Sequence, residues 1–358
     1  MKLPGDRHGG NVYRIAVETG HSGILDFSAS INPLGMPRGA RQAIREALRD
    51  NAEALAHYPD PEATGLVSAI ASRYDIDPGG IIAANGSTEL IYLVPRALRP
   101  RTVLVTAPTF SEFERSALVS GAKIKRLPLR KNDGFAVDPA EFIGAMKGTD
   151  IAVLCNPNNP TARVLGRDSV LEIANAARRS RCVLVVDEAF MDFCPEESVL
   201  VEDNPYLIVL RSLTKFYALA GMRLGFGHFP LRIKKRLDDM KEPWSVNTLS
   251  QLAGVAALGD SSYASRTLSL IKKERDRLVR SLSTIGLKVY SSSANYILLG
   301  CRDAKGLSKA LIGKGIAVRD CSNFRGMGNS HIRVAVRTEE DNDKLLEAIR
   351  SVIGRVSS

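Results

Sequence analysis

The sequence has no long apolar segment and few cysteines. No apolar run approaches the roughly 18 residues that a membrane-spanning helix requires. The five cysteines are an odd number, are scattered and form no C-x-x-C pair, which disfavours a disulfide framework and a zinc site. The first residues, Met1 to Asp6, lack the apolar core of an export signal. We therefore expect a cytoplasmic protein that spans no membrane and binds no metal.

Low-complexity tracts, internal repeats and DNA-binding motifs are also missing. The formal charge is +10, but the basic residues are spread along the chain, with only short pairs such as Arg178-Arg179 and Lys234-Lys235. Without a basic stripe interleaved with aromatics, we expect no nucleic-acid partner. A positive field of this kind equally favours a small anionic substrate.

Strand-like and helix-like segments alternate through the first two thirds of the chain. The strand-like runs are short, almost continuously apolar and rich in β-branched residues, and they lie at 81–84, 102–106, 122–127, 151–155, 182–187 and 206–210. Helix-like segments, notably 166–180, separate them. This alternation predicts an α/β fold with a mostly parallel sheet covered on both faces. A ligand then belongs at the carboxyl ends of the strands.

The pattern changes after Pro230. Helical patterns at 231–241, 246–258 and 262–284 lead to strands near 287–300 and 331–336 and to helices near 304–313 and 338–353. At 358 residues the chain is long enough for one large core and a smaller lobe. We therefore predict a large domain over 36–255 and a small α+β domain formed by 256–358 and the N-terminal arm, 1–35.

One lysine stands where lysines are rarely found. Lys215 follows the apolar run 206–210, and lysine avoids burial unless it is paired or used. Ser212 and Thr214 precede it, and Arg223 follows eight residues later. An amine beside hydroxyl donors and a fixed cation is typical of a Schiff-base lysine next to a phosphate-binding cup. An ordinary surface lysine at a loop tip is the alternative.

Polar residues follow three other predicted strands. Asn85-Gly86-Ser87-Thr88-Glu89 opens a helix, where free N–H groups favour an anion, although a plain N-cap also fits. Asp187 ends a strand and would need a cationic partner, which the protonated nitrogen of a pyridine cofactor could supply. Asn159 could bond the hydroxyl of that ring and Phe110 could stack on its face. A Walker-B reading of Asp187-Glu188 fails because no G-x-x-x-x-G-K-[ST] precedes it.

In this order the motifs resemble those of pyridoxal-phosphate (PLP) enzymes of the aspartate-aminotransferase fold type, from about residue 6 to the C-terminus. The resemblance makes Lys215 the Schiff-base lysine, Asp187 the partner of the ring nitrogen, Asn159 the partner of the ring hydroxyl and Phe110 the stacking ring. It also implies a set of residues that hold the cofactor phosphate: Gly86, Ser87, Thr88, Ser212, Thr214 and Arg223. Tyr58, in His-Tyr-Pro-Asp-Pro, resembles a tyrosine that reaches the phosphate of a neighbouring subunit, which implies a homodimer.

Two branches of that group compete. Histidinol-phosphate aminotransferases share the Tyr-Pro-Asp loop and the lysine motif. The L-threonine-O-3-phosphate decarboxylases, which make the aminopropanol linker of cobalamin, are similar in more stretches: 8–11, 26–35, 211–217, 243–247 and 333–337. They also resemble this chain in having Phe190 where aminotransferases usually carry a tyrosine; neutral drift is the alternative. We therefore expect decarboxylation of L-threonine O-3-phosphate to (R)-1-aminopropan-2-yl phosphate, with a phospho-amino-acid aminotransferase as the alternative and a non-enzymatic ligand sensor as a third reading.

A substrate that carries both a carboxylate and a phosphate needs cations for both groups, and arginine suits both. The resemblance assigns Arg319, His8 and Asn32 to the phosphate, and Arg333 to the carboxylate end, with Asn159 nearby. Arg337 either assists or is an ordinary solvated arginine.

Overall fold

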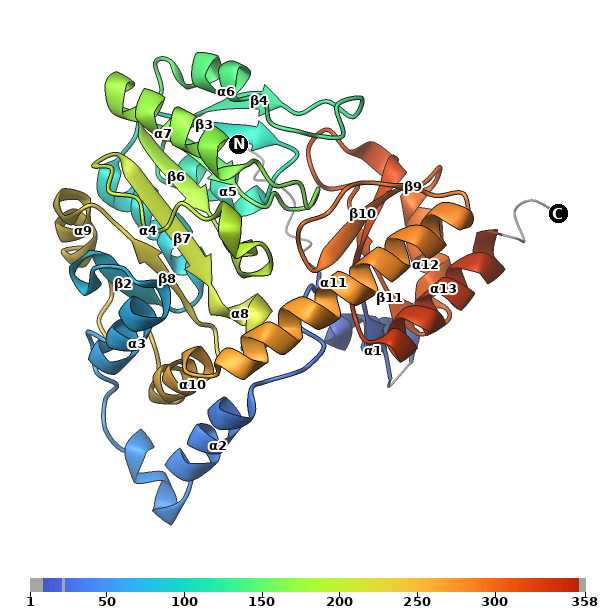
Figure 1. Cartoon of the computed structure of the whole chain (residues 1–358), viewed down its shortest axis with the longest axis horizontal. Helices are drawn as coiled ribbons and strands as arrows, with labels where there is room; N and C mark the ends of the chain where they lie inside the picture. The colour runs from blue at the N-terminus through green and yellow to red at the C-terminus, as the bar shows by residue number, and fades with distance from the viewer. Residues whose placement is uncertain (1–8, 21–22, 354–358) are drawn as a thin grey trace.

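The computed structural model describes residues 9–20 and 23–353. Two lobes, each built on its own β-sheet, lie side by side and are connected by the long helix α11 (Ser261–Thr284) (Figure 1). The larger lobe holds a seven-stranded sheet, and the smaller lobe holds a four-stranded sheet. No helix among the residues described is long and apolar enough to cross a membrane.

The large sheet has the strand order β2-β8-β7-β6-β5-β3-β4. Its strands are β2 (Ile81–Ala84), β3 (Thr102–Ala107), β4 (Lys123–Pro128), β5 (Ile151–Cys155), β6 (Val183–Asp187), β7 (Leu207–Ser212) and β8 (Gly225–His228). Neighbours from β4 to β7 pair in parallel, and β8 runs antiparallel to both of its neighbours, β7 and β2. The predicted mostly parallel sheet is confirmed, and β8 was not predicted because its sequence, GFGH, lacks an apolar run.

Helices cover both faces of the large sheet, because alternate strand residues point to opposite faces. Val103 and Val105 pack on one side with α4 (Ser87–Leu98), α5 (Ser111–Val119) and α9 (Leu231–Asp238). Leu104 lies in the core on the other side, with α3 (Thr64–Tyr74), α6 (Pro139–Met146) and α7 (Arg167–Ser180). Since both faces are buried, the carboxyl ends of the strands are the open edge where polar residues gather.

The small lobe has the strand order β12-β13-β10-β9. Its strands are β9 (Lys288–Val289), β10 (Tyr296–Gly300), β12 (Arg319–Asp320) and β13 (His331–Ala335), and its helices are α11, α12 (Ala304–Ile312) and α13 (Glu339–Ile353). β1 (Leu25–Asp26) pairs in parallel with β11 (Ile316–Ala317), so the segment after α1 (Val12–Thr19) lies against this lobe, as Figure 1 shows.

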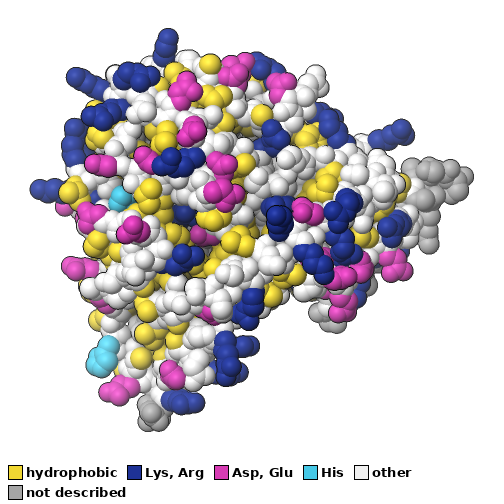
Figure 2. All heavy atoms as spheres, viewed as in Figure 1, with side chains coloured by type: hydrophobic (Ala, Val, Ile, Leu, Met, Phe, Trp, Pro, Cys, Tyr) yellow, Lys and Arg dark blue, Asp and Glu magenta, His cyan; other side chains and the backbone are white. Residues whose placement is uncertain are grey.

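The boundary between the lobes lies near α11. Helix α10 (Thr248–Leu258) packs against α2 (Arg38–Ala47) and α3, so a division after residue 255 would cut through α10. The division into 36–255 and 1–35 plus 256–358 stays a prediction. On the face shown in Figure 2, lysines and arginines are interspersed with acidic side chains rather than gathered in one stripe.

Candidate active site

A cleft of about 580 Å³ opens at the carboxyl ends of the large sheet, which is a volume typical of a site for a cofactor or small ligand. The large lobe contributes the ends of β6 and β7 and the starts of α4 and α5, and the small lobe contributes β12 and β13. The predicted site residues that line the cleft are Ser87, Thr88, Phe110, Asn159, Asp187, Ser212, Lys215, Arg319 and Arg333. Residues almost 250 positions apart therefore meet in one site.

Lys215 lies in α8 (Leu213–Phe216), a short helix that follows the fully buried strand β7. Its Nζ donates a hydrogen bond to Thr214 Oγ1 at 2.8 Å, and that oxygen lies 2.7 Å from Ser212 Oγ. Burial lowers the pKa of Lys215 to about 8, with Arg223 and Arg333 adding to the effect. A large part of the population is therefore neutral near pH 8, which is the state a nucleophilic amine requires.

Asp187 is 4% exposed, and its Oδ1 accepts a hydrogen bond from the Ala189 N–H at 3.1 Å. Burial raises the pKa of Asp187 to about 7, although Ala189 and Lys215 oppose the shift. We expected this carboxylate to be paired, yet within residues 9–20 and 23–353 it has no ion pair. A protonated pyridine nitrogen would be the cationic partner that this carboxylate lacks, so Asp187 fits the PLP ring.

The start of α4 is shaped for an anion. Gly86 has φ of +78°, and a Cβ at this position would lie 2.5 Å from Arg223 Nη2. A Cβ on Gly225 would lie 2.5 Å from the Ser87 nitrogen. Both glycines let cations and N–H groups converge on one cup, and the first N–H groups of a helix have no partner within it. The cup therefore fits a cofactor phosphate.

Thr214 belongs to the predicted phosphate set but does not line the cleft. It is 1% exposed, and its hydroxyl connects Ser212 and Lys215. Arg223 borders an adjoining hollow together with Thr88. The structure thus gives Thr214 the task of orienting its two neighbours, and leaves Ser87, Thr88 and Ser212 on the surface of the cleft.

Two arginines of the small lobe form the other side of the cleft. Arg333 Nη1 donates to Asn159 Oδ1 at 2.5 Å, Nη2 donates to the Ser28 carbonyl at 2.9 Å, and the guanidinium lies 4.7 Å from the centre of the Tyr296 ring. Arg319 donates to Asn323 Oδ1 at 2.9 Å. Burial, with Arg333 nearby, lowers the pKa of Arg319 to about 10. In the described part of the chain neither arginine has a carboxylate partner.

The remaining predicted substrate contacts are His8, Asn32 and Arg337. His8 lies outside the described residues. Asn32 does not line the cleft, because its Nδ2 donates to the Phe216 carbonyl and to Thr267 Oγ1, each at 2.7 Å, and its Oδ1 accepts from the Leu34 N–H at 3.0 Å. The Asn32 side chain therefore connects its own segment to α8, the helix that contains Lys215, and its amide is not free to bind a ligand.

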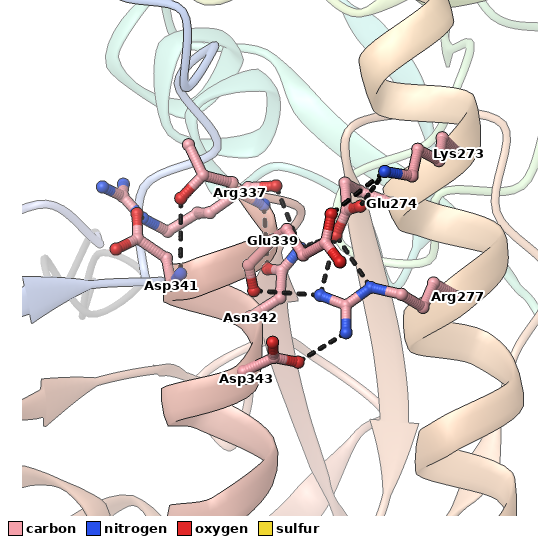
Figure 3. A network of polar contacts seen from close by, with 9 residues as sticks. Lys273, Glu274, Arg277, Arg337, Glu339, Asp341, Asn342 and Asp343 are labelled. Carbon is pink, nitrogen blue, oxygen red and sulfur yellow. Dashed lines mark hydrogen bonds and ion pairs between the residues drawn. The ribbon is translucent and has the colours of Figure 1, made fainter.

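Arg337 also has a structural task instead of the predicted ligand contact. Its Nε donates to Asp341 Oδ2 at 2.9 Å, and its Nη1 donates to the Asp26 carbonyl at 3.2 Å. In Figure 3 it belongs to a polar network that joins α11 to α13, in which the Asn342 amide donates to the Arg337 carbonyl and to Glu274. The network holds β13, and with it Arg333, against the long helix.

Tyr58 lies apart from the cleft of its own chain. It is 80% exposed and stacks on Trp244, with ring centroids 4.8 Å apart. It therefore makes no contact with the cleft that contains Lys215 in the same chain.

Sequence reasoning missed several residues around the cleft. Asp26, Ser28 and Glu112 line it, and Tyr92 donates to Glu112 Oε2 at 2.6 Å. Below the lysine helix, Arg211 forms buried ion pairs with Glu188 and Asp192 at 3.1 and 3.0 Å. Only the placement of Arg211 directly before Ser212 gave a signal; the others depend on partners far away in the sequence.

A lysine in the short helix after β7 and a buried aspartate without an ion pair, placed beside a phosphate cup between two lobes, define a PLP-dependent enzyme of the aspartate-aminotransferase fold type. The chain belongs to the aminotransferase class I and II family, whose model matches residues 22–349. PLP is the cofactor of this family. The residues predicted to hold it that line the cleft are Lys215, Asp187, Asn159, Ser87, Thr88 and Ser212.

Individual relatives are similar over the whole chain. A threonine-phosphate decarboxylase of Salmonella typhimurium is 38% identical, with 99% of this chain and 98% of the relative covered. The adenosylcobalamin biosynthesis bifunctional protein CobDQ of Leptospira interrogans is 33% identical over 98% of this chain and 41% of its own length. The crystal structure of a histidinol-phosphate aminotransferase from Clostridium acetobutylicum superposes with a TM-score of 0.86 at 28% identity, covering 93% of this chain and all of the other.

Proposed function

We propose that the chain is a PLP-dependent decarboxylase that converts L-threonine O-3-phosphate to (R)-1-aminopropan-2-yl phosphate and CO2, for the aminopropanol linker of cobalamin. The observation that carries the proposal is the pair of buried arginines without carboxylate partners, Arg319 and Arg333. Two unpaired buried cations are costly unless a ligand neutralises them. A substrate with one carboxylate and one phosphate supplies both counter-charges.

The similarity to named decarboxylases supports the same substrate. A threonine-phosphate decarboxylase and a cobalamin-biosynthesis protein match almost the full chain at 38% and 33% identity. Phe190 adds a chemical argument: it is 5% exposed, lines the cleft and packs edge-on against Tyr296, with ring centroids 4.8 Å apart. No hydroxyl is therefore available at this position to bond the ring oxygen of the cofactor, in contrast to the tyrosine expected in aminotransferases.

Three residues hold the cofactor or the substrate, and Lys215 transfers a proton. When bound, PLP supplies an electron-withdrawing ring that accepts the electron pair left on Cα. Asp187 keeps the ring nitrogen protonated, and Arg319 binds the substrate phosphate while Arg333 binds the carboxylate. Holding the two ends of the substrate would fix which bond of Cα is presented for cleavage, so binding energy from the remote phosphate would select loss of CO2 over loss of the proton. Lys215 is placed to return a proton to Cα after CO2 has left.

The test is an assay of CO2 and aminopropanol phosphate from purified enzyme, PLP and L-threonine O-3-phosphate, with no 2-oxo acid present. We expect both products in equal amounts. Lys215→Ala should abolish turnover and the visible absorbance of covalently bound cofactor. Activity that depends on 2-oxoglutarate and releases no CO2 would instead support a histidinol-phosphate or related aminotransferase.

We further infer that the active unit is a homodimer in which Tyr58 reaches the cofactor phosphate of the neighbouring subunit. Tyr58 and Trp244 form an exposed aromatic pair, and exposed aromatic pairs of this kind are typical of interfaces. A hollow lined by Thr88 and Arg223 opens beside the phosphate cup and could receive such a side chain.

Complementation tests this dimer. Mixed dimers of Lys215→Ala and Tyr58→Ala chains contain one site with both residues intact, so co-refolding the inactive Lys215→Ala chain with the weakened Tyr58→Ala chain should restore activity. Absence of restoration in a mixture that forms dimers by light scattering would contradict sharing of the site.

We also place the chain in the cytoplasm. All five cysteines are free thiols, and four of them are buried. Unpaired cysteines are typical of a reducing compartment, and a phospho-amino-acid substrate would be found there. Localising a tagged chain by cell fractionation would test the assignment.

A further inference from the structure

The turn Asp26–Ala29 lines the cleft but has no role in the function described so far. One carboxylate oxygen organises it: Asp26 Oδ1 accepts hydrogen bonds from the Ser28 N–H at 2.7 Å, the Ser28 hydroxyl at 2.6 Å and the Ala29 N–H at 3.3 Å. Ser28 is 4% exposed. A buried serine with both of its donors bound to one carboxylate has a fixed orientation, so its two oxygens are available as acceptors.

Each oxygen of Ser28 holds a different part of the site. The carbonyl oxygen accepts from Arg333 Nη2 at 2.9 Å, and Oγ accepts from the Gly10 N–H at 2.8 Å. Ser28 therefore connects the arginine assigned to the substrate carboxylate with the Gly9-Gly10 segment, which also lines the cleft.

The Gly9-Gly10 segment fits closely against the same serine. A Cβ at Gly9 would overlap with the Ser28 carbonyl oxygen and would lie 3.3 Å from Oγ. Because the overlap is with backbone, an alanine at this position must displace the segment or the carbonyl that holds Arg333. Gly23 offers a contrast, since a Cβ there meets nothing within 4 Å.

Arg333 itself depends on these contacts for its orientation. Asn159 Oδ1 and the Ser28 carbonyl each accept from a different terminal nitrogen, and the Tyr296 ring supports the face of the guanidinium. An arginine has five N–H donors. Two of them make these bonds, and the others remain for a ligand. In the chain as described, Nε has no hydrogen-bond partner. Loss of the Ser28 contact would let the guanidinium turn about its bond to Asn159.

We propose that Asp26 and Ser28 are positioning residues that orient Arg333 for the substrate carboxylate and at the same time dock the Gly9-Gly10 segment at the cleft, so that the two events are coupled. The proposal rests on the proposed function, since it concerns the residue that holds the carboxylate to be lost. Ser28 acts through its contacts with Arg333 and Gly10.

The experiment compares four variants of the PLP-loaded enzyme. Gly9→Ala and Ser28→Ala disturb the contact, whereas Gly23→Ala and Ser116→Ala are matched controls for a free glycine and for a buried serine elsewhere, Ser116 being 2% exposed and bonded to the Phe113 carbonyl. KM for L-threonine O-3-phosphate should rise about tenfold in the first two, the equivalent of one hydrogen bond. The ratio of CO2 released to substrate amine lost should fall as well.

Two further readouts separate coupling from simple loss of packing. Amide hydrogen exchange of residues 9–20, followed without substrate, should be faster in Ser28→Ala than in the unmodified enzyme and unchanged in Ser116→Ala. The double variant Gly9→Ala/Ser28→Ala should resemble either single variant, about tenfold in KM, because both disrupt the same contact between Ser28 and the Gly9-Gly10 segment. A hundredfold increase would show independent effects and overturn the coupling.

The outcomes also distinguish this inference from the proposed function. If the unmodified enzyme releases no CO2, the decarboxylase assignment fails. If it does, and Gly9→Ala and Ser28→Ala behave like their controls in KM, CO2 ratio and exchange, the decarboxylase stands and the positioning role of Asp26 and Ser28 is wrong. Gly9 lies at an exposed position, so its variant remains informative even if Ser28→Ala folds poorly.

Discussion

Replacing Asp187 with asparagine should stabilise the enzyme without its cofactor while abolishing its function. Burial raises the pKa of Asp187 from 3.8 to about 7, and each pH unit of such a shift corresponds to about 1.36 kcal/mol. The ionised carboxylate therefore costs the folded state about 4 kcal/mol above pH 7. Lys215 loses an attractive partner in the variant, so we expect a net gain of about 2 to 4 kcal/mol.

The sign of the pH dependence follows from which state holds the proton. Between about pH 4 and pH 7 the unfolded chain has released the proton of Asp187, whereas the folded chain retains it. The contribution of Asp187 to the stability of the unmodified apoenzyme thus falls as the pH rises through this window and is level above it. The advantage of Asp187→Asn should be small near pH 4, grow toward pH 7 and then remain constant.

Urea denaturation of the apoenzymes at pH 5 and pH 8.5, followed by circular dichroism, measures this difference. Asp303→Asn is the control: Asp303 is exposed, caps α12 through the Gly306 N–H, and has a pKa lowered by that bond, so its variant should gain no stability at pH 8.5. PLP affinity of Asp187→Asn should fall sharply, because an amide cannot hold the ring nitrogen protonated. An Asp187→Asn apoenzyme less stable than the unmodified one at pH 8.5 would refute the reasoning.

Three further changes test other parts of the site. Arg319→Gln should raise KM for L-threonine O-3-phosphate about 10- to 100-fold, the worth of a charged hydrogen bond, with PLP affinity unchanged in an absorbance titration. Phe190→Tyr should lower the ratio of CO2 released to amine lost, because the new hydroxyl can bond the ring oxygen; an unchanged ratio would assign Phe190 to neutral drift. Arg211→Met should cost about 3 to 5 kcal/mol in urea denaturation, since it leaves Glu188 and Asp192 as uncompensated buried carboxylates.

The parts of the site that sequence could predict are those set by local pattern. Runs such as 183–186 and 207–210 indicate buried strands by themselves, and the residue after each run must lie at the carboxyl edge of a parallel sheet. For this reason Asp187, Ser212 and Lys215 could be placed on one edge without knowing their neighbours. The start of α4 was equally accessible, because a Gly-Ser-Thr sequence after a short strand has only a few conformations.

The remaining errors come from contacts between residues far apart in the sequence. Asn32 was assigned to the substrate phosphate by resemblance, yet its amide donates to Thr267 and to the Phe216 carbonyl of α8. Arg337 was expected either to assist at the substrate or to be solvated, but its Nη1 donates to the Asp26 carbonyl, 311 positions away in the sequence. Local pattern cannot tell which of several polar residues near a site is already occupied by a partner 200 residues distant.

The charges of the cleft share one physical cause, and this explains why a stable chain tolerates them. Asp187 has a raised pKa while Lys215 and Arg319 have lowered ones, in each case mainly because burial penalises the charged form. The ring nitrogen of PLP would offset the first penalty, and a substrate anion would offset that at Arg319. A ligand that binds only the folded state stabilises it. Relief of these burial penalties therefore adds to the free energy of binding of the cofactor and of the substrate. The cofactor and the substrate should therefore each raise the midpoint of thermal unfolding of the enzyme, by an amount set by their affinity and free concentration.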